Sequence, residues 1–153
     1  MMRNLCAALI GMIATGGHAQ TIPPGAIKPY PSHVTVVLPA DIVWRPAGTG
    51  QMQAPLFGDP AKPGPYGLLS KWQPGNYSRP HSHSTDRWIY VVSGTWWKSS
   101  SATFDPATAY PYPAGSFVTD LAGQMHWDGV RDEEVVLEIV GMGPMTTTRA
   151  PQP

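Results

Sequence analysis

Proline and glycine occur so often in this chain that long helices are excluded from most of it. The sequence has 18 Pro and 16 Gly among 153 residues, and both residue types interrupt helices and mark turns. No window of a dozen residues carries the apolar stripe of an amphipathic helix. Apolar and polar residues instead alternate in residues 66–72 and 135–139, which is the period of a half-buried strand. The pattern predicts an all-β protein.

Further strands are predicted where short apolar runs are bounded by turn residues. These runs cover residues 33–38, 88–92 and 116–121. Short strands separated by turn signals are typical of a β-sandwich or a small β-barrel, and 153 residues leave room for one such domain. We expect this domain to occupy residues 33–144. Residues 145–153 have few side chains to bury and are predicted to form a flexible tail.

The charge composition excludes one class of partner. Ten Lys and Arg residues balance ten Asp and Glu residues, and charged residues make up only 13% of the chain. The sequence has no basic run that would follow a phosphate backbone, so nucleic acid is not expected as a partner. Hydrophobic residues make up 42% of the chain, which is enough to build a core.

The first 19 residues have the pattern of a cleaved export signal. Arg3 gives a positive start, residues 5–13 are apolar, and the small residues Gly17 and Ala19 stand where a signal peptidase cuts. The apolar stretch is shorter than the roughly 20 residues of a membrane-spanning helix, so no membrane association is expected after cleavage. We therefore expect a periplasmic or secreted protein. Residues 20–32 contain four prolines and are predicted to form an extended arm.

Three histidines have the spacing of a metal site. His81 and His83 are separated by one residue, and in extended backbone such residues project from the same face. With His126 they would supply three neutral imidazoles, a ligand set that suits transition metals and leaves positions open for water or substrate. We predict one divalent transition metal here, with Fe, Zn, Ni, Cu and Mn as candidates. His33 is interpreted as a surface or hydrogen-bonded residue.

The spacing of glycine and histidine resembles the two motifs of the cupin superfamily. The first motif is matched by Gly75, His81, His83 and Gly94, and the second by Gly115, Gly123 and His126. The resemblance implies a single-domain jelly-roll β-barrel in which the three histidines bind the metal. Cupin barrels commonly pair through a sheet or exchange an N-terminal strand, so the resemblance and the arm at residues 20–32 together favour a homodimer.

Several residues depart from the cupin pattern. Arg87 stands where most cupins have a glutamate ligand, and a guanidinium has no lone pair with which to bind a metal. Leu121 and Val130 replace supporting Pro and Asn residues. Asp86 would face the histidines only if the chain bulged there, so we predict three histidines without a carboxylate. Arg87 either forms a salt bridge with Asp86 or Asp128, or anchors a carboxylate or another anion beside the metal.

The aromatic residues near the first motif also admit two interpretations. Trp88 and Tyr90 are predicted, together with Arg87, to bind the substrate, because aromatic side chains stack on ligands. Trp96 and Trp97 could join them in lining a pocket. A barrel wall or a dimer face explains these four residues equally well.

The resemblance implies a class of chemistry. A ferrous centre with three histidines resembles that of some cupin dioxygenases, which act on thiols, diketones or ring-cleavage substrates, and the substrate expected here is a small organic molecule that can be an anion. Holding substrate and oxygen on one metal requires no separate acid–base machinery, and no catalytic triad or carboxylate pair is apparent in the sequence. Two alternatives stay open. One is a Zn or Ni Lewis-acid isomerase that uses Tyr90, Asp86 or Asp128 as proton acceptor, and the other is a non-catalytic module that binds a small ligand or a metal.

Overall fold

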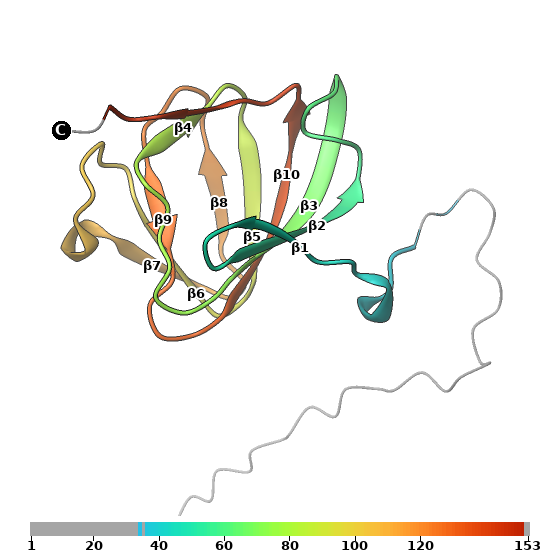
Figure 1. Ribbon diagram of the computed structural model, residues 1–153, viewed down its shortest axis with the longest axis horizontal. Coiled ribbons are helices and arrows are strands. Elements are labelled where there is room, and N and C mark those ends of the chain that lie inside the picture. Colours follow the sequence, from blue (N-terminus) through green and yellow to red (C-terminus); the bar gives the residue numbers. More distant parts are fainter. Residues whose placement is uncertain (1–33, 35, 152–153) are drawn as a thin grey trace, which may run out of the picture. The chain divides into compact units, whose positions relative to one another are not determined.

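The computed structural model describes residues 34 and 36–151, and they form an all-β domain. All of its strands lie in the compact unit Val37–Pro153 (Figure 1). The helices in this part of the chain are two single 3-10 turns, η1 (Pro39–Asp41) and η2 (Pro106–Thr108), and neither is long or apolar enough to cross a membrane. The all-β prediction is confirmed. The export signal and the arm predicted at residues 1–32 lie outside the described residues.

The larger sheet has six antiparallel strands in the order β1-β2-β3-β10-β5-β8. They are β1 (Arg45–Gly48), β2 (Gln51–Phe57), β3 (Gly64–Trp72), β5 (Arg87–Ser93), β8 (Phe117–Asp120) and β10 (Val135–Gly143). The central strands β3 and β10 pair along their full length. The two alternating segments of the sequence are therefore β3 and β10, and the predicted strands at residues 88–92 and 116–121 are β5 and β8.

Two smaller sheets form the opposite wall of the barrel (Figure 1). One has the order β7-β6-β9 and consists of β6 (Thr95–Ser99), β7 (Tyr110–Pro113) and β9 (Trp127–Gly129). The other pairs β4 (His81–His83) with β11 (Thr147–Arg149). A β-bridge between His81 and His126 connects β4 to the segment that enters β9. This bridge joins the two motifs that carry the predicted ligands.

The core lies between these walls and is built by strand alternation. Its buried members are Tyr66, Leu68, Trp72, Ile89, Val91, Trp96, Val130, Val135, Leu137 and Ile139. Burying an aliphatic or Phe-sized side chain contributes about 1.5–3 kcal/mol. The turn from β5 to β6 requires Gly94, which has a φ of 74°, and a Cβ there would lie 2.5 Å from the carbonyl oxygen of Glu134. The second glycine of the first motif is therefore explained by the backbone.

The N-terminal strand prediction was wrong for the part of residues 33–38 that the structure describes. Residues 34 and 36–38 form no strand, and the chain continues into η1. Val34 and Val37 are 46% and 40% exposed. The apolar residues of this segment therefore do not pack against a partner strand. Pro39 follows directly, and it has no N–H with which to continue a ladder.

The C-terminal segment differs from the flexible tail that its composition predicts. Thr147, Thr148 and Arg149 pair with His83, Ser82 and His81, and Ala150 N–H donates to the carbonyl of Pro80 at 2.9 Å. These bonds join main-chain groups, which every residue carries, so the segment becomes ordered without burying apolar side chains. In Figure 1 the red end of the chain runs beside β4.

Candidate metal centre

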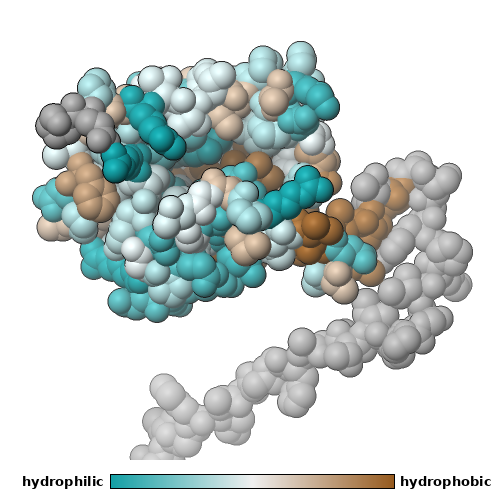
Figure 2. Space-filling view, in the orientation of Figure 1, coloured by the Kyte–Doolittle hydropathy of each residue, from teal (hydrophilic) through white to brown (hydrophobic). Residues whose placement is uncertain are grey.

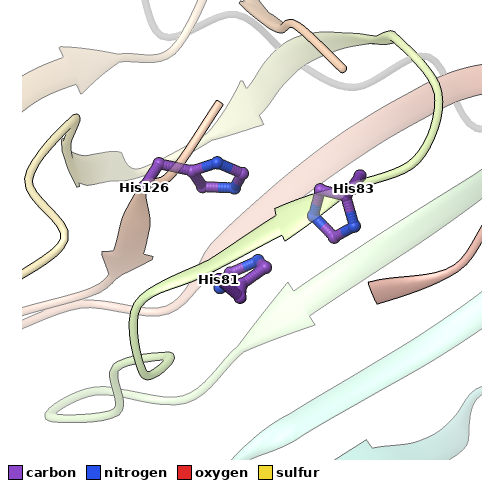
Figure 3. Close-up of side chains that lie close together, drawn as sticks. All are labelled: His81, His83 and His126. Atoms are coloured by element: carbon purple, nitrogen blue, oxygen red, sulfur yellow. The ribbon is translucent and has the colours of Figure 1, made fainter. Parts of the chain in front are cut away.

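Two main-chain hydrogen bonds bring the three histidines together. His81 N–H donates to the His126 carbonyl at 2.8 Å, and His126 N–H donates back to the His81 carbonyl at 2.9 Å. His83 lies two residues along β4 and faces the same side. One ring nitrogen from each histidine lies within 4.8 Å of the others, and the three rings surround a common space in Figure 3. The cluster can hold one metal ion.

The hydrogen bonds of the three rings leave their Nε2 atoms free. In His81, Nδ1 lies 2.7 Å from the main-chain carbonyl oxygen of the residue two positions earlier. In His126, Nδ1 lies 3.1 Å from the carbonyl oxygen at the same relative position. Because a carbonyl oxygen only accepts, Nδ1 carries the proton and Nε2 keeps a lone pair in both residues. Nδ1 of His83 lies 3.1 Å from the Thr147 hydroxyl. Nε2 of His83 and Nε2 of His126 are buried without a hydrogen-bond partner, and a metal ion would satisfy both.

Burial keeps two of these imidazoles neutral. It lowers the pKa of His83 to about 2, with the nearby Arg87 charge acting in the same direction. Burial, followed by the Lys98 charge, lowers the pKa of His126 to about 4. A neutral imidazole is the form that binds a metal. Both residues are therefore ready to act as ligands at neutral pH without losing a proton.

Arg87 pairs with a carboxylate that neither sequence interpretation named. Its partner is Asp120, which lies directly across from it on β8 and also accepts a hydrogen bond from Lys98. The Asp120 side chain has no exposed surface, and those of Arg87 and Lys98 are 12% and 11% exposed. Burial opposes ionisation of Asp120, but the Lys98 and Arg87 charges outweigh it and hold the pKa of this carboxyl well below its usual range. Asp120 Oδ2 also lies 3.5 Å from Nε2 of His126.

Strand alternation separates Arg87 from the two aromatic residues predicted to act with it. Arg87 and Ile89 point inward and line the cavity beside the histidines. Trp88 and Tyr90 occupy the alternate positions of β5 and are 42% and 46% exposed. The structure therefore places Arg87 at the site and leaves Trp88 and Tyr90 on the outer face of the larger sheet.

The other residues weighed for this region also separate. Trp96 lines the cavity, and its Nε1–H donates to Asp128 at 3.2 Å. Trp97 instead packs against Arg131, whose guanidinium carbon lies 3.4 Å from the ring centroid. Asp86 accepts a hydrogen bond of 2.7 Å from an N–H in the loop after β8. Its carboxylate stabilises that loop and is absent from the cavity wall.

His81 and His83 line a cavity of about 740 Å³ between the two walls of the barrel. Trp72, Ile89 and Leu137 supply apolar lining, and Gln51 and Gln53 supply amide groups from β2. Figure 2 shows a hollow in this face with hydrophobic residues at its depth. The volume lies in the range of small-molecule sites. The two glutamines were missed because only the pairing of β2 with β3 brings them to the barrel interior.

Thr147 is a further functional residue that the sequence analysis missed. Its hydroxyl lies 3.1 Å from Nδ1 of His83, and its strand is the edge partner of β4. The run of three threonines at residues 146–148 was the available signal, because β-branched residues favour strands. A tail predicted to be flexible thus contacts the ring of a candidate metal ligand.

Replacing Thr147 with Val is expected to weaken metal binding by about tenfold, since losing the hydrogen bond that orients a ligating histidine typically costs 10–100-fold in affinity. Val keeps the shape and the strand preference of Thr. Zinc affinity measured by competition with a chromophoric chelator checks the effect. Thr148→Val is the matched control, because Thr148 pairs with Ser82 and not with a histidine. Equal losses in the two variants would show that the strand matters and the hydroxyl does not.

Comparisons with known proteins identify the family of this β-barrel. A family model described as the ChrR cupin-like domain matches residues 32–146. No curated protein gives a significant match.

Several solved structures are similar in fold. The polyketide cyclase RemF from Streptomyces resistomycificus aligns with a TM-score of 0.65 at 14% identity, over 78% of this chain and 87% of its own. KdgF from Halomonas sp. aligns with a TM-score of 0.57 at 15% identity, over 72% and 94% of the two chains. A sugar phosphate isomerase of the cupin superfamily from Silicibacter pomeroyi gives 0.53 and 18%, over 68% of each chain. Because the family model spans most of the sequence, the chain belongs to the ChrR cupin-like domains of the cupin superfamily.

Proposed function

We propose that this protein binds one divalent transition metal ion through His81, His83 and His126 and uses it to transform a small organic molecule held in the cavity. One observation carries the proposal. The Nδ1 atoms of the three rings are engaged, while buried Nε2 atoms without partners face a common space beside a cavity of about 740 Å³. Such an arrangement costs free energy unless an ion is bound.

The residues of the site fit such an ion. When bound by three imidazoles, it would supply open coordination positions and Lewis acidity and, in the case of iron, access to dioxygen chemistry. The chain itself contributes position and environment. Trp72 and Leu137 line the cavity with apolar surface that excludes water. The side-chain amide of Gln51 donates a hydrogen bond of 2.9 Å to the Ser70 hydroxyl. This bond fixes the orientation of the amide in the cavity wall.

The acid–base groups of the site favour a dioxygenase-type reaction as the first candidate. Tyr90 and Asp86 are absent from the cavity wall. Asp128 is present there, but its two carboxylate oxygens accept hydrogen bonds from the Ser78 hydroxyl at 2.5 Å and from Trp96 Nε1–H at 3.2 Å. Of the three proton acceptors considered from the sequence, Asp128 alone lines the cavity, and each of its oxygens already accepts a hydrogen bond. This cavity lining therefore favours a reaction that relies on the metal ion and needs no side-chain base.

A Lewis-acid isomerase or cyclase is the second candidate. The Tyr77 hydroxyl belongs to a residue that lines the cavity, and a phenol can carry a proton. The names of two similar structures, a polyketide cyclase and a sugar phosphate isomerase, point in the same direction. With the export signal expected at residues 1–19, we propose that either reaction takes place in the periplasm or outside the cell.

Oxygen uptake separates these candidates. Iron-loaded protein is expected to consume oxygen with at least one member of a panel of thiols, diketones and hydroxylated aromatics, and the apoprotein is expected to consume none. Substrate conversion that proceeds equally well without oxygen would favour the Lewis-acid reaction. Binding without any conversion, with iron, zinc or nickel loaded, would contradict the proposed catalysis and support a capture module.

A further inference from the structure

We propose that the cavity mouth binds the carboxylate group of a small organic acid through Arg79 and Arg149, which both lie beside His81. This inference rests on the proposed function, since it names the class of molecule that would reach the metal. The site is distinct from the anion anchor at Arg87 considered from the sequence, because the Arg87 guanidinium pairs with Asp120.

Strand pairing places both arginines beside the metal ligand. Arg149 in β11 is the direct cross-strand partner of His81, and cross-strand partners project from the same face of a sheet. Arg79 lies two residues before His81, and the bond from Ala150 N–H to the Pro80 carbonyl continues the pairing past the end of β11. Both arginines line the cavity. Their backbones are held by the same ladder that holds the ligand.

Neither guanidinium has an acidic partner. Within the described residues, the salt bridges involve Lys62, Lys71, Arg87, Lys98 and His126, and neither Arg79 nor Arg149 takes part in one. Among the residues that the structure describes, Asp128 is the single carboxylate that lines the cavity. Its oxygens are engaged by Ser78 and Trp96. Arg79 and Arg149 therefore bring two positive charges to a cavity wall that carries one carboxylate, and neither forms a salt bridge with it.

The interior adds to this positive potential. The cations Arg87 and Lys98 share the one carboxylate of Asp120. A divalent ion would increase the excess of positive charge in a partly desolvated site, where charges interact more strongly than in water. An anionic ligand would offset this excess.

The shape of a carboxylate suits the two arginines. A guanidinium donates two parallel hydrogen bonds to carboxylate oxygens. Behind the mouth, Trp72, Ile89 and Leu137 form apolar wall, which favours an acid with a hydrocarbon or aromatic body. The geometry thus points to a small organic acid with its carboxylate at the mouth and its body in the barrel.

The test compares acids with their neutral amides. Zinc-loaded full-length protein is titrated with benzoate, hexanoate and succinate and with the corresponding amides, and binding is followed by chemical-shift changes in nitrogen-15 NMR spectra. At least one acid is expected to bind about tenfold or more tightly than its amide, and added salt should reduce this ratio because it screens exposed charges. The double variant Arg79→Gln, Arg149→Gln should lose the preference while its affinity for the amide stays unchanged.

A matched control and a metal assay keep the outcomes separate. Arg45→Gln removes an exposed arginine of β1 that does not line the cavity, and it should retain the full preference. Zinc content is measured in every sample. Protein that binds no zinc would contradict the proposed function. Zinc-loaded protein that binds acids and amides equally, or that binds none of the acids, would overturn the carboxylate site alone.

Discussion

Replacing His126 with Ala is expected to lower metal affinity by more than about 100-fold while leaving the fold intact. Loss of a group that merely orients a ligand costs 10–100-fold, so loss of a ligand should cost more. The main-chain hydrogen bonds between His126 and His81 do not use the imidazole, and the barrel core lies elsewhere. His81→Ala should behave in the same way. Inductively coupled plasma mass spectrometry measures the metal, and far-ultraviolet circular dichroism measures the fold.

Gln124→Ala is the matched control for His126→Ala. Gln124 is exposed and contributes its carbonyl oxygen to His126, which Ala also provides. This variant should keep the wild-type metal content. Wild-type metal content in both His126→Ala and His81→Ala would show that the histidines are not the ligands. Loss of the β signal in the two variants would show that the imidazoles are needed for folding.

Replacing Asp120 with Asn is expected to destabilise the protein by about 3–5 kcal/mol, the usual cost of removing one partner from a buried ion pair. The substitution leaves Arg87 and Lys98, both nearly buried, without the carboxylate that they share. The free energy of unfolding is obtained from urea denaturation of the metal-free protein. If Asp120→Asn is unfolded already without urea, the triple variant Asp120→Leu, Arg87→Met, Lys98→Met should fold, because apolar groups of similar size can replace a buried ion cluster.

Asp59→Asn provides the comparison for an exposed ion pair. Asp59 pairs with Lys62 at 3.1 Å, but the two side chains are 41% and 77% exposed, and such pairs contribute little to stability. Its urea midpoint should stay close to that of the wild type. An Asp120→Asn midpoint equally close to wild type would contradict the view that this carboxylate stabilises the barrel.

The histidine site could be predicted from the sequence because local rules determine it. One-residue spacing puts His81 and His83 on one face of any strand, and glycines such as Gly94 mark turns that the backbone requires. Together with His126, these positions form a motif that spans two segments of the chain. The cluster within 4.8 Å agrees with the convergence that this motif predicts.

The rest of the site depends on pairing between distant segments, which composition does not reveal. Asp120 meets Arg87 because β8 lies beside β5 in a particular register. Thr147 and Arg149 reach the histidines because main-chain groups of the last strand pair with β4. The tail has few apolar side chains, so a prediction based on burial assigns it no structure. In the same way, alternation alone predicted a strand at residues 33–38, although the described residues there have no partner strand.

X-ray absorption spectroscopy of full-length protein purified without chelators tests the central claim most directly. The account predicts about one transition metal ion per chain, with three imidazole nitrogens at about 2.0–2.1 Å if the metal is zinc and lighter scatterers in the remaining positions. Protein that stays metal-free after incubation with iron, zinc, nickel, copper and manganese salts, or a bound ion whose shell lacks imidazole scattering, would contradict it.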